Sequence, residues 1–148
     1  MEDFNPKDII DFRCELYAIR QKFGPRYYCE RQAAQEAARL WGVHCNEHGV
    51  LDQITEDIRV EHQRYSATIR LYKTEQGYWH VSHGFSAPGS GFAVPATVWN
   101  ETAFTNELAA RRWAVDRLLR RCDARLDAEL RAFRDRLAME LTPQLALF

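Results

Sequence analysis

The strongest constraint on the fold is a change in hydrophobic periodicity at Tyr65. From Tyr65 to Val98, apolar and small polar residues alternate in three runs, which is the pattern of half-buried β-strands. Before residue 43 and after residue 105, apolar residues recur every three or four positions, as in amphipathic helices. We therefore expect an α+β fold in which helices flank a three-stranded antiparallel sheet.

Helix boundaries divide the N-terminal part into two helices. Asn5 and Pro6 favour a helix start there, and Gly24 and Gly42 favour two helix ends, which predicts an αα-hairpin. The expected units are a helical hairpin (1–42), an acidic connection (43–63), an antiparallel sheet (65–99) and a long helix (105–141), all in a single domain spanning residues 1–148.

The uncharged stretch 78–99 is predicted to be a hairpin. Pro88 and the glycine after it suit the two central positions of a type II turn. A phosphate-binding loop is disfavoured, because the stretch lacks lysine and a strand follows it instead of a helix. Pro95 restricts the third strand to a sheet edge or a bulge. Tyr78 and His80, expected to point outward, and Pro88 form a candidate partner-binding surface.

The C-terminal apolar stripe continues from Thr105, the expected helix cap, to Leu141. One unbroken helix would be roughly 55 Å long. A domain of this size is only about 40 Å across. We therefore expect the helix to break near Cys122, to pack its outer half on the first two helices, or to form a homodimer.

Composition limits the classes of function. The net charge of −1 gives no overall attraction to nucleic acid or to an anionic membrane. The apolar runs are too short to span a bilayer, and the N-terminus lacks the apolar segment of a signal peptide. The four cysteines show no framework spacing. We expect a cytoplasmic protein with reduced thiols, no cofactor and no membrane contact.

Local charge is less even than the total. Between residues 111 and 125, six arginines stand against two aspartates, a pattern suited to phosphate groups. The predicted nucleic-acid contacts are Arg111, Arg112, Arg117, Arg120, Arg121 and Arg125. In the alternative interpretation these side chains pair with acids along a solvated helix face or with the acidic segment. That segment, with Asp52, Glu56 and Asp57, is a candidate protein-binding surface.

Two further hypotheses concern histidines. Alternation places His83 on the inward face of its strand, which suits a small enzyme. No nucleophile or second base shares that face, so the sequence does not support catalysis. His44, Cys45 and His48 offer zinc donors, but a second ligand pair is missing, so we expect no metal site.

The order β-β-β-α between residues 65 and 121, with a Trp-bearing hairpin and the helix FTNELAARRWA, resembles the second half of a double-stranded-RNA-binding domain. In size and composition the chain is also similar to small phage and plasmid proteins, including anti-CRISPR and anti-restriction inhibitors. We predict a non-enzymatic binding protein that acts through a macromolecular interface. Nucleic acid is the preferred partner, and a nucleic-acid-processing protein complex, which the chain would inhibit, is the alternative.

Overall fold

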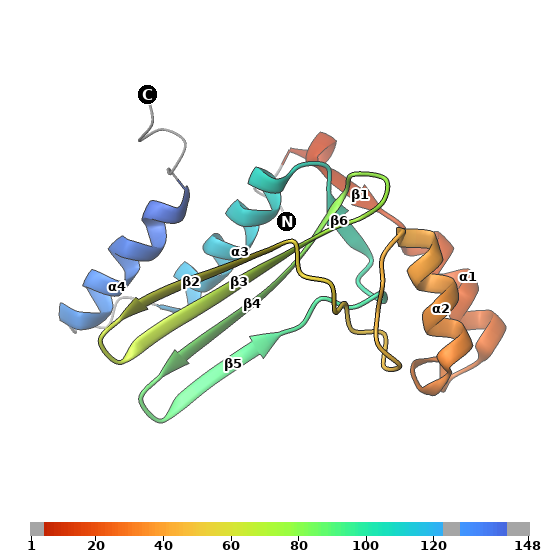
Figure 1. The fold of residues 1–148 in the computed structure, drawn as a ribbon, viewed down its shortest axis with the longest axis horizontal. Helices are drawn as coiled ribbons and strands as arrows, with labels where there is room; N and C mark the ends of the chain where they lie inside the picture. The colour runs from red at the N-terminus through yellow and green to blue at the C-terminus, as the bar shows by residue number, and fades with distance from the viewer. Residues whose placement is uncertain (1–4, 123–127, 142–148) are drawn as a thin grey trace.

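In the computed structural model, which describes residues 5–122 and 128–141, two helices cover one face of a β-sheet and a helical hairpin packs at one end of the other face (Figure 1). The described helices are α1 (Arg13–Phe23), α2 (Arg31–Trp41), α3 (Glu107–Arg121) and α4 (Ala128–Ala138), with short 3-10 turns η1 (Pro6–Asp8), η2 (Tyr27–Cys29) and η3 (Met139–Leu141). The described strands are β1 (Ile9–Asp11), β2 (Glu56–His62), β3 (Tyr65–Lys73), β4 (Trp79–Ala87), β5 (Ser90–Val94) and β6 (Thr102–Phe104).

The sheet is antiparallel and larger than predicted. Its order is β1-β6-β4-β3-β2, and β5 pairs with β4 as well. The three predicted strands are present as β3, β4 and β5. The expectation of only three strands is wrong, because β1, β2 and β6 are also present. Strand β2 forms within the expected acidic connection, and β1 and β6, of three residues each, are too short to show a periodicity. The mixed α and β architecture is confirmed.

The predicted first helix begins later than expected. Asn5 does act as a cap, accepting a hydrogen bond of 3.0 Å from the Lys7 backbone N–H, but it caps only the three-residue turn η1. Ile9 and the two residues after it then pair with β6. Local helix preference is small, and hydrogen bonding to a distant strand overrides it here. From Arg13 onward the helical prediction holds.

The αα-hairpin of α1 and α2 is confirmed. Gly24 and Gly42, with φ angles of 84° and 69°, end the two helices in a backbone region that favours glycine. Trp41 attaches the hairpin to the loop between β5 and β6: its Nε1 donates to the Val98 carbonyl at 3.1 Å. The ring of Trp41 also meets the edge of His80 at a centroid distance of 4.4 Å.

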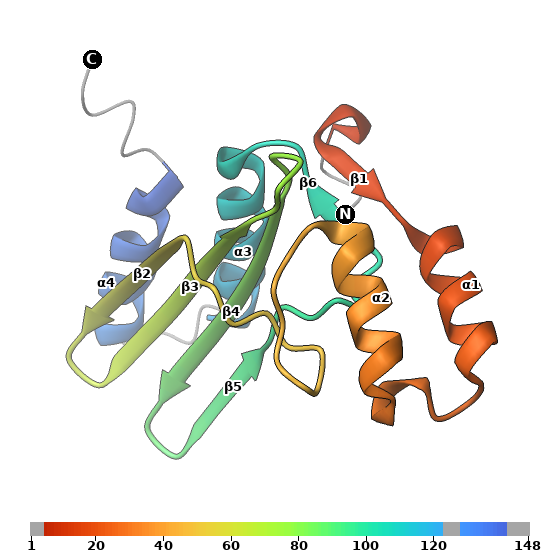
Figure 2. The same ribbon diagram turned by 45° about the vertical axis from the view of Figure 1, so that its right-hand side comes forward.

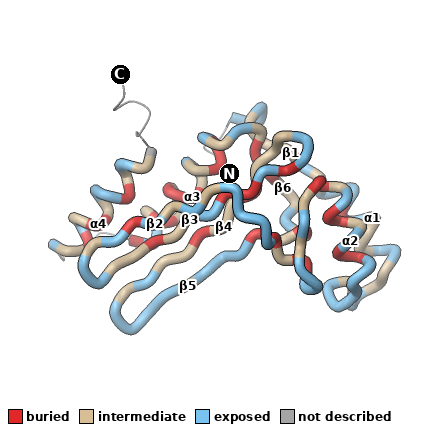
Figure 3. Tube along the Cα trace, viewed as in Figure 1, coloured by how far each residue is buried: buried red, intermediate tan, exposed pale blue. Residues whose placement is uncertain are grey.

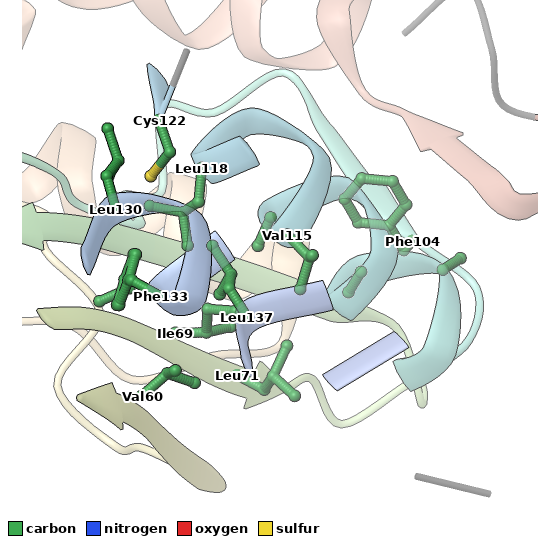
Figure 4. Packing of buried hydrophobic residues seen from close by; sticks show 14 residues of the cluster. Val60, Ile69, Leu71, Phe104, Val115, Leu118, Cys122, Leu130, Phe133 and Leu137 are labelled. Atoms are coloured by element: carbon green, nitrogen blue, oxygen red, sulfur yellow. The ribbon is translucent and has the colours of Figure 1, made fainter. Parts of the chain in front are cut away.

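One continuous helix over 105–141 is not formed; of the three alternatives, the break near Cys122 is confirmed, because α3 ends there and a second helix, α4, follows. Asn106, not Thr105, caps α3, which ends at Arg121, and α4 runs back beside it over the same sheet face (Figures 1 and 2). Folding back buries the apolar stripe of α4 in the chain's own core, as Figure 4 shows for Phe133 and Leu137. A homodimer through this helix therefore loses its rationale. The predicted contact Arg125 lies outside the described residues.

Candidate functional site

The outer edge of β5 is the first component of the site. Within the described part of the chain, β5 pairs with β4 alone, and no other strand lies along its far side in Figure 1 or Figure 2. The strand is largely exposed, as Figure 3 shows, and the Val94 residue is 41% exposed. Gly89, with a φ of 75°, makes the predicted turn into it, and β5 ends immediately before Pro95, as expected for an edge strand.

The two long outer strands differ in the charge of their residues. The sequence of β5, SGFAV, contains no charged residue, whereas four of the seven residues of β2, EDIRVEH, are charged. Charged side chains on an edge strand discourage a further strand from adding to it. The β2 edge is therefore protected against strand addition, and the β5 edge lacks this protection.

The second component is a pair of arginines on α3, one turn apart. The alanine-rich face of α3 packs on the sheet, and Arg121, in the last turn of the helix, lies over Phe92 of β5. The guanidinium carbon of Arg117 lies 5.1 Å from the centre of the Trp113 ring, and that of Arg121 lies 4.7 Å from the centre of Phe92. Neither arginine has a carboxylate partner among the described residues.

His83 lies beneath this pair, on the inward face that the alternation predicted. Its ring meets the rings of Trp113 and Phe92 edge-on, at centroid distances of 5.4 and 5.9 Å. Burial lowers the pKa of His83, and the charges of Arg117 and Arg121 lower it further. The residue is only 7% exposed, and its Nδ1 has no hydrogen-bond partner among the described residues.

Two other predicted arginines are paired with carboxylates. Arg111 contacts Glu56 at 2.9 Å and Glu107 at 2.7 Å, and Arg120 contacts Asp116 at 3.0 Å. The pair with Glu56 is the neutralisation by the acidic segment that the sequence left open. Arg112 is exposed on the same helix. The net positive charge that the predicted arginines present is therefore smaller than the sequence alone indicates.

The predicted partner-binding surface is divided. The expectation that His80 points outward to solvent is wrong: it is 2% exposed, because the helical hairpin covers that end of the sheet. Burial lowers its pKa to about 4. Tyr78 is half-buried beside β4, whereas Pro88 is exposed at the turn into β5 and so adjoins the candidate site.

The predicted acidic contacts are also engaged within the fold. Asp52 lies 2.7 Å from the His44 ring, and Asp57 lies 3.5 Å from Arg70. His44 thus meets a carboxylate, and residues 5–122 and 128–141 contain no cluster of three or more residues suited to hold a metal ion. Burial and the charge of Asp52 raise the pKa of Cys45, which disfavours the thiolate that zinc requires.

A hollow of about 530 Å³ lies on the face of β3, β4 and β5 opposite to α3. Its floor carries small hydroxyl side chains, among them Ser66, Thr68 and Ser82, and Ile54, 43% exposed, lines it too. Strands β4 and β5 thus have the arginines on one face and an open hollow on the other. Both faces adjoin the free edge of β5.

Sequence reasoning missed the aromatic members of the site, Phe92 and Trp113. A signal was present, because Trp113, Arg117 and Arg121 are spaced by four residues and so share one helix face. Comparison with family models, curated proteins and solved structures finds no match to this chain. None of the described helices has both the length and the apolar character needed to cross a bilayer.

Proposed function

We propose that the protein is a non-enzymatic binding module that captures an extended segment of a partner polypeptide as an added strand along β5. The free, uncharged outer edge of β5 carries this proposal. An unpaired strand edge presents backbone N–H and C=O groups that an extended chain can match, which is a recurrent mode of peptide recognition. The hollow on one face and the exposed Val94 on the other leave space for alternate side chains of the segment.

Nucleic acid, the partner preferred from the sequence, receives less support. Binding to a duplex commonly rests on several phosphate contacts. Carboxylates pair with Arg111 and Arg120. Arg117 and Arg121, in contrast, pack on aromatic rings and have no carboxylate partner among the described residues. A nucleic acid also lacks the backbone donors that would use the β5 edge.

The test uses three octapeptides that alternate valine with glutamate, with lysine or with threonine. Backbone amide exchange of the protein is followed by NMR, with each peptide and with a thymidine dodecamer. Strand addition predicts that at least one peptide slows exchange at alternate amides of β5, while the amides of the charged edge strand β2 serve as an internal control and stay unchanged. The proposal fails if no peptide protects β5, or if only the dodecamer binds, with an affinity that falls linearly in log salt.

A further inference from the structure

We infer that the segment captured by β5 is acidic on the face that it turns towards α3; this inference rests on the proposed function. Two observations lead to it: Arg121 lies over Phe92 of β5 with Arg117 one turn away over Trp113, and neither of these two arginines has a carboxylate partner among the described residues. The net charge of the whole chain is −1, so a preference for acidic partners would arise from this site and not from overall attraction.

The geometry places an added side chain within reach of Arg121. A strand added to β5 would lie about 4.8 Å outside it. The residue opposite Phe92 would then have its Cβ about 5 Å from the Cβ of Phe92. The guanidinium carbon of Arg121 lies 4.7 Å from the centre of the Phe92 ring. The guanidinium is therefore as far above the sheet as the carboxylate of a neighbouring side chain on the added strand would be. Charge-assisted hydrogen bonds to carboxylates are the interactions that guanidinium groups make best.

The aromatic supports favour this interaction further. Packing on Phe92 and Trp113 restricts Arg121 and Arg117, so less side-chain entropy is lost when a partner binds. Burial is the largest cause of the lowered pKa of His83, and the positive charges of Arg117 and Arg121 lower that pKa further. A lysine-bearing segment would meet these positive charges with a like charge, whereas a glutamate-bearing segment would neutralise them.

The test compares the glutamate–valine, lysine–valine and threonine–valine octapeptides by fluorescence anisotropy at 50 and 500 mM salt. The native protein should bind the glutamate peptide about tenfold more tightly than the lysine peptide at low salt, and the difference should shrink at high salt. Arg121→Glu should abolish or reverse the preference, and Arg121→Gln should weaken it. Arg120→Glu is the matched control, because Arg120 lies next to Arg121 but pairs with Asp116.

Equal affinity for the acidic and basic peptides, or an equal loss in Arg120→Glu and Arg121→Glu, would overturn the inference. This failure is distinguishable from failure of the proposed function. If only the charge preference is wrong, the neutral threonine peptide still binds and still protects the β5 amides. If strand addition itself is wrong, none of the three peptides protects them. Thermal unfolding of each variant verifies that the fold is retained.

Discussion

The guanidinium carbon of Arg121 lies 4.7 Å from the centre of the Phe92 ring, so the last turn of α3 meets the edge strand β5 through a cation and an aromatic face. Arg121 thus brings a positive charge to the strand edge, and one turn earlier Arg117 packs over Trp113 of the same helix. This pairing of charge with a free edge is the basis of the binding account.

The charge of Arg121 should be detectable at His83. Because Arg121 lowers the pKa of His83 in addition to burial and Arg117, replacing it by glutamine should raise that pKa. Histidine ring resonances followed by NMR between pH 4 and 8 measure the change. Arg120→Gln is the control and should alter the pKa of His83 less. An unchanged pKa in Arg121→Gln would contradict the position of the guanidinium.

Burial of His80 should make the fold sensitive to acid. Its pKa is lowered to about 4 from an ordinary value of 6.5, so the unfolded chain binds a proton at a higher pH than the folded chain does. Stability should therefore fall as the pH drops from 6.5 to 4, with a contribution from His80 of about 3 kcal/mol. Urea unfolding across this range should show a steeper loss in the native protein than in His80→Gln. Equal slopes would refute the assignment.

The position of α4 in the core can be tested by a cavity. Phe133 is fully buried between α4 and the sheet, so Phe133→Ala should lower the free energy of unfolding by about 3–5 kcal/mol. Met139 is 68% exposed, and Met139→Ala should change it by less than about 1 kcal/mol. Urea denaturation measures both values. If the two variants were equally stable, α4 would not be part of the core.

The start of α3 depends on the side chain of Asn106. It accepts a hydrogen bond of 2.8 Å from the Ala109 backbone N–H, so Asn106→Ala should cost about 1 kcal/mol of stability. Asn106→Asp keeps an acceptor and suits the positive helix end, so it should be nearly neutral. Thermal unfolding distinguishes the two variants, and a loss of the same size in both would indicate that the cap is not the cause.

Periodicity predicted the elements that are long and bury one face. Strands β3 and β4 and helix α2 follow their patterns closely, because their side chains alternate or repeat against a core, whereas the third predicted strand, β5, ends at Val94 instead of Val98. The pattern failed where long-range contacts decide. Ile9 pairs with Phe104, which is distant in the sequence, and the residues around Ile9 do not indicate that partner. The sequence did not decide whether the C-terminal helix is continuous, because the apolar residues around Phe133 recur with the same spacing whether or not the chain folds back.

The candidate site was predicted only in part. Six arginines were visible in the sequence, but which of them remain uncompensated depends on acids that are distant in the chain, such as Glu56 beside Arg111. His80 was misplaced because alternation assigns a face without showing which face a second set of helices covers. His83 was placed correctly, because it shares the face of β4 that carries Val81 and Phe85, and that face packs against α3.

The most direct test of the account uses two forms of the glutamate–valine octapeptide, each N-methylated at every second residue but in opposite registers. An added strand turns one alternate set of its N–H groups towards β5 and the other set towards solvent. Isothermal titration calorimetry should therefore show that one methylated peptide loses binding while the other binds like the unmodified peptide. Equal binding, or equal loss, of the two methylated forms would contradict strand addition at β5.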